Sequence, residues 1–581
     1  MTPAIPRRRA RVVLGAVLLS FLALSFRLVN VQASRADEFA DLARRQRFRT
    51  IELPAIRGAI YDRDGRDLAV SIPARTIYGN PKEVTDPAAT ARALSPVIGV
   101  SAGSLERTLR KDRGFVYLAR RVEVDVAARV AELDLVGISV LDEAKRANPG
   151  GVLAANVLGF TGTDGEGLGG LEFAYERLLR GTPGERILEQ DPLGRRIPQG
   201  MFEEQPPEPG SDLVLTIDRD LQHAAEVALS EAVESSQAKG GSVVVADPVT
   251  GDVLAMATSP TFDPNDISDL DLTTTRNRPV TDTYEPGSVS KLVTAAAALG
   301  TGTVTPDTSV LITRAIRVGG KDFTDAHFVQ ESSIPFSEVI SQSSNVGTIR
   351  VAMMTGAEPV RSYMERFGYG RPTALGFPGE TSGALPSTTR WSTSLPTMAI
   401  GQGLSTTLLQ LVRAYGIVAN DGVMVEPRLV RGWVGPSGEL RPTRPARGER
   451  VIDAATAEQL RAILHRVTED GTGTAAVIDG YAVAGKTGTA QKPAPSGGYQ
   501  GHMASFLGMV PADAPRFVIG VVLDEPTPIW SSIVAAPVFR EVGQAALRID
   551  RVPPAATTTR ASDEETLALS TGVDQSPDGL G

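Results

Sequence analysis

Ser288 and Lys291, three positions apart, have the residue types and spacing of an activated nucleophile. A serine hydroxyl is a weak nucleophile near neutral pH and needs a neighbouring base, which a lysine amine provides only when it is neutral. The turn-forming pair Pro286-Gly287 precedes them, and an alanine-rich apolar run, 292–299, leads to Gly300, a pattern that predicts a buried helix with a glycine stop. Residues three apart share a helix face. We therefore expect the hydroxyl and the amine to lie side by side in the first turn of this helix.

Ser-x-x-Lys is a common pattern, and Ser236-Gln237-Ala238-Lys239 also fits it within a polar linker. Two later motifs distinguish the site at Ser288. Ser343-Ser344-Asn345 is the only Ser-x-Asn in the chain, and Lys486-Thr487-Gly488 is the only Lys-Thr-Gly. The three motifs occur in the order that serine acyl-transfer enzymes use, which strongly favours nucleophilic acyl transfer at Ser288.

Each motif has a chemical role to fill in such a reaction. Burial and a second cation, Lys486, would lower the pKa of Lys291 and so keep its amine neutral. Ser343, expected at the end of one helix, could relay a proton to the leaving amine. Asn345, expected at the start of the next helix, could hold a substrate amide with its donor and acceptor groups.

The strand predicted at 486–489 would line the edge of the cleft, where an extended peptide could pair with it. Its backbone N–H near Thr489, together with that of Ser288, would face the developing oxyanion. One such donor is worth about 3 kcal/mol in a transition state. The substrate-binding residues that we expect are Ser344, Thr487, Gly488 and Thr489.

Composition excludes several other functions. The net charge is -9, so nucleic acid is not an expected partner, and the chain has no cysteine for disulfides, thiol catalysis or thiolate-bound zinc. The four histidines are widely spaced, at 223, 327, 465 and 502, and we expect neither a metal site nor a cofactor. A nominal Gly-x-Ser-x-Gly at 99–103 lacks the preceding strand that a nucleophile elbow needs.

The N-terminal region predicts a membrane anchor. Four arginines within residues 7–11 precede an apolar segment, 12–31, that Arg27 interrupts. A helix of about 20 residues crosses the roughly 30 Å of a bilayer core. A cleaved signal peptide ending near Ala33 is the alternative. Arginines also follow the segment at 44–49, so charge does not settle the orientation.

Strands are predicted at both ends of the region that contains the three motifs. A hairpin at 242–258 begins it, and segments near 481–489, 504–510 and 517–523 end it, with mostly helical patterns between, including 335–343, 346–354 and 454–467. This arrangement predicts one antiparallel sheet joined by the first and last segments of the domain, an α+β fold. The segment 517–523 is apolar on both faces, so helices should cover both sides of the sheet.

With these residues in view, the sequence resembles the class B penicillin-binding proteins, and most closely the division-type (FtsI-type) peptidoglycan D,D-transpeptidases. The resemblance runs from about residue 12 to 547. The segments that carry it are 57–63, 167–172, 284–291, 343–347 and 485–490.

The resemblance implies a membrane anchor, a non-catalytic pedestal and a transpeptidase domain of the serine β-lactamase type. It implies that Ser288 attacks the D-Ala-D-Ala bond of a stem peptide on lipid-linked or nascent glycan, that an amine of a neighbouring strand then accepts the acyl group, and that β-lactams acylate Ser288. It also implies a membrane-embedded glycosyltransferase of the FtsW type and other division proteins as partners. The expected regions are a cytoplasmic basic tail (1–11), the anchor (12–31), an extended mixed α/β pedestal (50–235), the extracytoplasmic transpeptidase domain (236–550) and a disordered acidic tail (553–581).

Other functions share these motifs. An elongation-type class B transpeptidase is not separated from a division-type enzyme by any single residue. A β-lactamase or a carboxypeptidase would use the same acyl-enzyme, although a class A β-lactamase needs Glu-x-x-x-Asn, and the only Asn between the second and third motifs, Asn420, has Gly416 four residues before it. A non-enzymatic scaffold is the remaining alternative.

Overall fold

The computed structural model describes residues 7–34, 47–189, 197, 199–326, 330–388, 392–494 and 497–554. Its chain divides into two compact units, each assembled from separate segments. The first comprises residues 1–58, 71–145 and 180–210, and the second comprises residues 59–70, 146–179 and 211–581. The acidic tail predicted at 553–581 lies, from residue 555 onward, outside the described residues.

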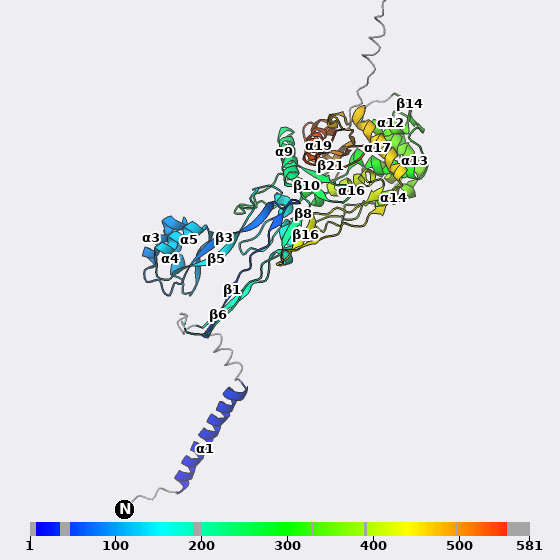
Figure 1. The fold of residues 1–581 in the computed structure, drawn as a ribbon. Coiled ribbons are helices and arrows are strands. Elements are labelled where there is room, and N and C mark those ends of the chain that lie inside the picture. Colours follow the sequence, from blue (N-terminus) through cyan, green and yellow to red (C-terminus); the bar gives the residue numbers. More distant parts are fainter. Residues whose placement is uncertain are drawn as a thin grey trace, which may run out of the picture. The chain divides into compact units, whose positions relative to one another are not determined.

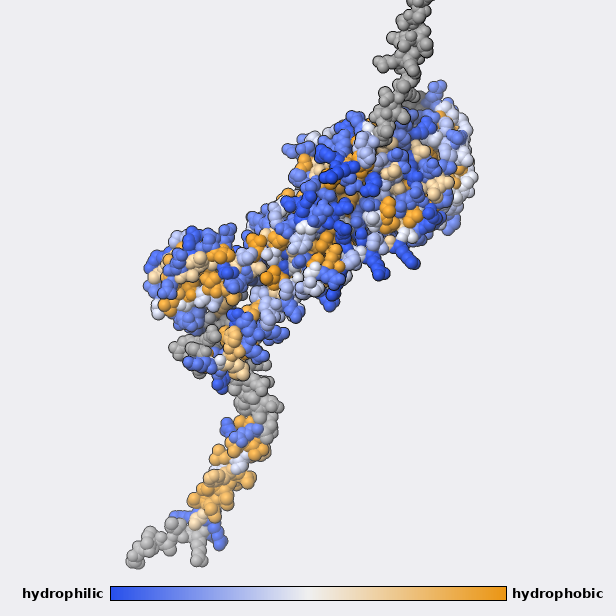
Figure 2. All heavy atoms as spheres, in the orientation of Figure 1, coloured by the Kyte–Doolittle hydropathy of each residue, from blue (hydrophilic) through white to orange (hydrophobic). Residues whose placement is uncertain are grey.

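The N-terminal helix α1 (Arg7–Val29) continues into a short π-helical segment, Asn30–Ser34. Residues 8–32 have a mean hydropathy of 2.3 in their most apolar stretch, and their apolar side chains are exposed. Figure 2 shows these exposed hydrophobic side chains in orange along α1. Within the part of the chain that the structure describes, α1 alone is long and apolar enough to cross a membrane, as an anchor requires.

The first unit contains two small assemblies. An antiparallel sheet joins β1 (Phe48–Leu53), β6 (Gly184–Glu189) and β7 (Phe202–Gln205). In the other assembly, three helices enclose an apolar core with the strands of a second sheet. These elements are α3 (Pro87–Ile98), α4 (Ala102–Leu109) and α5 (Val124–Glu132), with the later part of β3 (Asp67–Gly79), β4 (Val116–Val122) and β5 (Ile138–Ala147).

The nominal nucleophile elbow at 99–103 lies between two helices of this assembly. Gly99 ends α3 with a left-handed backbone, and Ser101 precedes α4. An elbow needs a strand before its serine, so the structure confirms that this motif is not one.

In the second unit, the predicted antiparallel sheet is present, with strand order β10-β9-β21-β20-β19. Its hydrogen-bonded neighbours come from distant parts of the chain, since β9 pairs both with β10, which follows it directly, and with β21, more than 250 residues later. The strands are β9 (Gly240–Ala246), β10 (Val253–Ser259), β19 (Ala484–Pro493), β20 (Tyr499–Val510) and β21 (Phe517–Asp524). Part of a seven-stranded sheet also lies in this unit. Its strands here are β17 (Leu440–Pro442), β16 (Val430–Val434), β8 (Asp212–Leu215), β2 (Ile60–Tyr61) and the start of β3.

Helices cover both faces of the five-stranded sheet, as predicted (Figure 1). Because successive side chains of a strand point to opposite faces, Val521 packs in one apolar core with α9 (Arg219–Ser235) and α19 (Ala536–Ile549), whereas Val522 packs in the other with α16 (Leu408–Ala419). The central strands are buried on both sides. This α+β core is the rigid frame on which the three motifs lie.

Candidate functional site

A single turn of 3-10 helix, Gly287–Ser290, carries Ser288 and leads directly into α11 (Lys291–Gly300). The predicted helix is therefore present, but Ser288 lies in the 3-10 turn and Lys291 is the first residue of the α-helix. Gly287 has a φ of +60°, and its N–H donates to the carbonyl of Gly401 at 2.9 Å. Glycine tolerates this left-handed conformation without strain, so the turn predicted from Pro286-Gly287 is confirmed.

Gly300 is required for a reason other than the predicted helix stop. It is the last residue of α11, and a Cβ on it would lie 2.2 Å from the hydroxyl of Tyr363. The close approach of α14 (Ala357–Arg366), rather than a left-handed cap, excludes a side chain here.

Lys291 joins the first motif to the second. Its Nζ lies 2.6 Å from the carbonyl oxygen of Ser343, 2.8 Å from Oδ1 of Asn345 and 3.3 Å from Oγ of Ser343. Ser343 lies between α12 (Phe336–Ser341) and α13 (Asn345–Thr355) with a φ of +61°. A non-glycine residue in this region is strained and persists where the surrounding structure imposes it. The two motifs thus meet at the lysine amine.

Lys291 and Lys486 are both fully buried. Burial disfavours a charged amine and lowers the pKa of Lys291 to about 7, although the carboxylate of Asp325 acts in the opposite direction. Burial also lowers the pKa of Lys486 well below its usual range, and the charge of Lys291 adds to this effect. Because the two buried amines repel each other when both are charged, the site disfavours double protonation and favours a neutral amine.

Asp325, which precedes α12 in the chain, fixes the second motif in place. Its carboxylate accepts hydrogen bonds from the hydroxyl of Ser344 at 2.8 Å, from the backbone N–H of Val346 at 3.0 Å and from that of Asn345. The Ser344 hydroxyl in turn accepts from Gly347 N–H at 3.0 Å and caps α13. A carboxylate at a helix N-terminus is favoured by the unpaired N–H groups there. Asp325 therefore sets the orientation of Asn345.

The third motif lies on β19, which packs against the 3-10 turn. Gly488 allows this contact, because a Cβ on it would lie 2.7 Å from Oγ of Ser505 and 2.8 Å from Cγ1 of Val289. The hydroxyls on either side of Gly488 each have a protein partner. Oγ1 of Thr487 lies 2.7 Å from Oγ1 of Thr472, and Oγ1 of Thr489 lies 3.3 Å from Oγ of Ser531.

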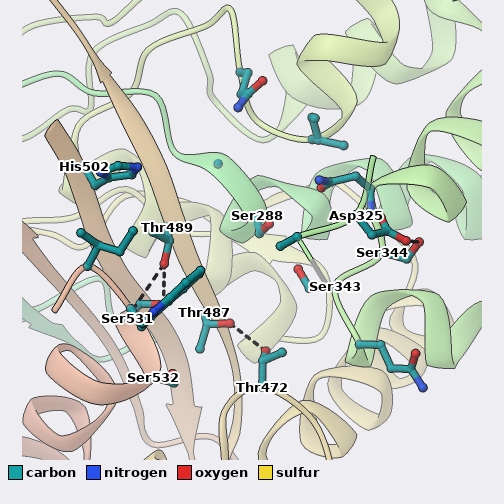
Figure 3. A pocket seen from close by; sticks show the side chains of 18 of the residues that line it. Ser288, Asp325, Ser343, Ser344, Thr472, Thr487, Thr489, His502, Ser531 and Ser532 are labelled. Carbon is teal, nitrogen blue, oxygen red and sulfur yellow. Dashed lines mark hydrogen bonds between the residues drawn. The ribbon is translucent and has the colours of Figure 1, made fainter. Parts of the chain in front are cut away.

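A cavity of about 330 Å³ opens between these elements, and we call it the cleft. Figure 3 shows Ser288, Ser343, Thr487 and Thr489 around this space. Six of the sequence-predicted residues line the cleft: Ser288, Ser343, Ser344, Asn345, Thr487 and Thr489. Lys291 and Lys486 are buried beside it, and Gly488 forms part of its strand wall. The structure thus brings the three motifs together.

The cleft residues that sequence reasoning did not single out include Asp325 and Thr472, which form hydrogen bonds with residues of the second and third motifs. Neither belongs to a recognisable motif, and each reaches the site through a loop. Among the residues that the structure describes, no group of three or more His, Cys, Asp or Glu side chains is arranged to hold a metal ion. Most polar side chains of the cleft are hydroxyls and amides, joined by the carboxylate of Asp325 and the imidazole of His502. With the two buried lysine amines beside them, these groups suit acyl transfer to and from a serine.

Comparison with protein families gives two matches. Residues 241–544 match the penicillin-binding protein transpeptidase domain, and residues 52–215 match the penicillin-binding protein dimerisation domain. The first match spans more than half of the chain and contains all three motifs.

Individual relatives match over nearly the whole chain. The probable peptidoglycan D,D-transpeptidase PenA of Neisseria gonorrhoeae is 35% identical, covering 96% of this chain and 96% of its own. Peptidoglycan D,D-transpeptidase FtsI of Escherichia coli K12 is 34% identical, and the match covers 95% of this chain and 93% of FtsI. The crystal structure of penicillin-binding protein 3 from Mycobacterium tuberculosis with aztreonam has a TM-score of 0.69 and 32% sequence identity. The match covers 87% of this chain and 98% of the chain in that structure. The chain therefore belongs to the class B penicillin-binding proteins, the family of the FtsI- and PenA-type peptidoglycan D,D-transpeptidases.

Proposed function

We propose that this D,D-transpeptidase works through Ser288 and that it cross-links the wall at the division septum. Ser288 Oγ attacks the carbonyl carbon of the penultimate D-Ala of a donor stem peptide. Lys291 takes the hydroxyl proton, and Ser343 passes a proton to the leaving amine, so that D-Ala departs and an acyl-enzyme remains. An amine of a second stem peptide then attacks the ester carbonyl, forms the cross-linking amide and returns a proton to Ser288.

The hydrogen bonds of Lys291 are the observation that carries this proposal. A neutral amine has two N–H donors and one lone pair. The carbonyl oxygen of Ser343 and Oδ1 of Asn345 are acceptors only, so together they take both donors of a neutral Lys291. The third contact of the amine, with the Ser343 hydroxyl at 3.3 Å, can then use the lone pair, so Lys291 can exchange a proton with a hydroxyl. The local geometry therefore suits a neutral base, in agreement with a pKa lowered to about 7.

The donor peptide would lie along β19 as an added strand. The terminal carboxylate of its last D-Ala can only accept hydrogen bonds, and the hydroxyls of Thr487 and Thr489 are donors on the cleft side of that strand. We assign the carboxylate to these two threonines, with the buried amine of Lys486 behind them. Asn345 and Ser344 complete the binding groups on the opposite wall, and the backbone N–H groups of Ser288 and Thr489 serve the oxyanion.

Asp325→Asn should lower the acylation rate by about ten- to a hundredfold, because hydrogen bonds to a charged acceptor are worth about 1.5–3 kcal/mol. It should also move the pH midpoint of acylation downward. The negative charge of Asp325 raises the pKa of Lys291, so removing that charge leaves the amine neutral to a lower pH. Stopped-flow acylation by a penicillin across pH measures both effects. A lower rate with an unmoved midpoint would contradict the electrostatic contact between Asp325 and Lys291.

The cellular assignment is supported by the similarity to FtsI of Escherichia coli, a match that covers 95% of this chain and 93% of that protein. We propose that α1 remains as an anchor with the N-terminus in the cytoplasm and that the transpeptidase domain, 236–550, follows a pedestal, 50–235, on the outer side. An FtsW-type glycosyltransferase and other division proteins would be the partners, and they would supply the nascent glycan strands.

Depletion of the protein from its native cells tests the septal assignment. We expect growth without septa, so cells should become longer or branched while their width stays constant, and a fluorescent fusion should gather at division sites. Widened or rounded cells with normal septa, and a fusion dispersed along the side wall, would instead identify an elongation enzyme. The acyl-transfer chemistry is the same in both cases, so this experiment tests the cellular role alone.

A further inference from the structure

Thr472 lies outside the three motifs, yet its hydroxyl meets a motif hydroxyl inside the cleft. Its Oγ1 and that of Thr487 are 2.7 Å apart, a distance typical of a strong O–H···O hydrogen bond. Figure 3 shows this contact between the two labelled side chains. Both threonines line the cleft, and Thr487 is only 8% exposed. The hydroxyl of Thr487 is therefore oriented by its protein partner before any substrate arrives.

The turn that carries Thr472 is held firmly. It follows α17 (Ala454–Glu469), and the N–H of Gly473 donates to the carbonyl of Val467 at 2.8 Å. A Cβ on Gly471 would lie 2.7 Å from the carbonyl oxygen of Ser341 and 2.9 Å from Cα of Val467. No side chain fits there, so the turn packs directly between the end of α17 and the residue two positions before Ser343. Such packing pre-organises the Thr472 hydroxyl.

The direction of the hydrogen bond follows from proton counting. A hydroxyl has one proton to donate, and in the Thr472–Thr487 pair either oxygen can be the donor. A substrate carboxylate accepts only. If Thr487 donates its proton to the carboxylate, then Thr472 has to donate to Thr487. Consecutive hydrogen bonds polarise one another, so this arrangement also strengthens the second donor.

We propose that Thr472 is a positioning residue that directs the hydroxyl proton of Thr487 toward the terminal carboxylate of the donor peptide. This inference rests on the proposed function, in which Thr487 binds that carboxylate. Thr472 does not itself contact the reacting atoms. It determines how strongly this enzyme distinguishes a substrate, or a β-lactam, that bears a carboxylate from one that does not.

The test compares acylation by benzylpenicillin with acylation by its methyl ester, which lacks the carboxylate. Thr472→Val keeps the side-chain shape and removes the hydroxyl, and we expect about a five- to tenfold lower acylation rate constant with the acid and an unchanged one with the ester. Thr472→Ser restores the hydroxyl and should restore the rate with the acid. Thr474→Val, on an exposed residue two positions further along, is the matched control and should change neither rate.

Each alternative outcome has a clear meaning. Equal losses with acid and ester, particularly with a lowered melting temperature, would show a merely structural role and overturn the proposal. An unchanged rate with the acid would overturn it as well. The wild type tests the premise separately. If the wild type reacts equally with acid and ester, then Thr487 does not bind the carboxylate, and the carboxylate assignment and the Thr472 proposal both fail while acyl transfer through Ser288 still stands.

Discussion

Ser288→Ala should abolish both penicillin acylation and cross-link formation, lowering the rate of each by more than about 10³-fold. The variant removes the one atom that forms the acyl bond, and no other hydroxyl can take its place at the start of α11 without moving the 3-10 turn. The turn is fixed by the hydrogen bond from Gly287 to Gly401 and by its contact with β19. Intact mass after exposure to penicillin, and analysis of cross-linked muropeptides formed from a lipid-linked substrate, measure the two losses.

The fold should survive this substitution, because Ser288 is only half-buried and alanine is tolerated in a 3-10 turn. A melting temperature within a few degrees of the wild type is the control. Ser290→Ala, two residues further along the same turn, is a matched variant whose hydroxyl does not line the cleft. Persistent acylation of Ser288→Ala at a different serine would mean that the nucleophile has been misassigned.

Lys291→Met should lower the acylation rate by about 10²- to 10⁴-fold, the range typical of a lost general base. Methionine fills a similar volume without an amine. The wild-type rate should rise as pH increases through about 7, because burial lowers the pKa of Lys291 to about 7 and only the neutral amine can take the serine proton. At pH 6 about a tenth of the amine would be neutral. The rate should therefore be about tenfold below its plateau at that pH.

The residual activity of Lys291→Met should show no such rise with pH. Lys291→Arg gives a second control, because a guanidinium remains charged at every accessible pH and cannot act as a base. Rapid-mixing acylation at a series of pH values measures all three proteins. A wild-type rate that is flat between pH 6 and 8, or an active arginine variant, would contradict general-base catalysis by Lys291.

Much of the site could be predicted from the sequence because its chemistry lies in short, local motifs. Ser288 and Lys291 are three residues apart on one helical segment, and Lys486 to Thr489 lie on one strand, so local structure alone fixes their mutual geometry. The sheet was also predictable, since the segments at 242–258 and 504–523 form runs of apolar residues of strand length that turn residues separate.

The remaining features depend on contacts between distant segments. Asp325 acts on Ser344 across 19 positions, and Thr472 acts on Thr487 across 15, each through a loop whose path no local pattern predicts. The glycine at 300 was expected to end a helix by its own conformation. Its actual constraint is Tyr363, which lies on another helix. Tertiary packing of this kind leaves no periodicity in the sequence.

The lifetime of the penicillin adduct on the wild-type protein tests the central claim most directly. The protein is mixed with a fluorescent penicillin, unbound label is removed, and intact mass is followed over time, with a digest to locate the adduct. We predict one adduct per chain, on Ser288, that persists for many minutes, as expected of a transpeptidase whose acyl-enzyme is kept for an amine acceptor. Loss of the adduct within seconds with release of hydrolysed drug would contradict this account and indicate a β-lactamase, and the absence of any adduct would leave only a scaffold role.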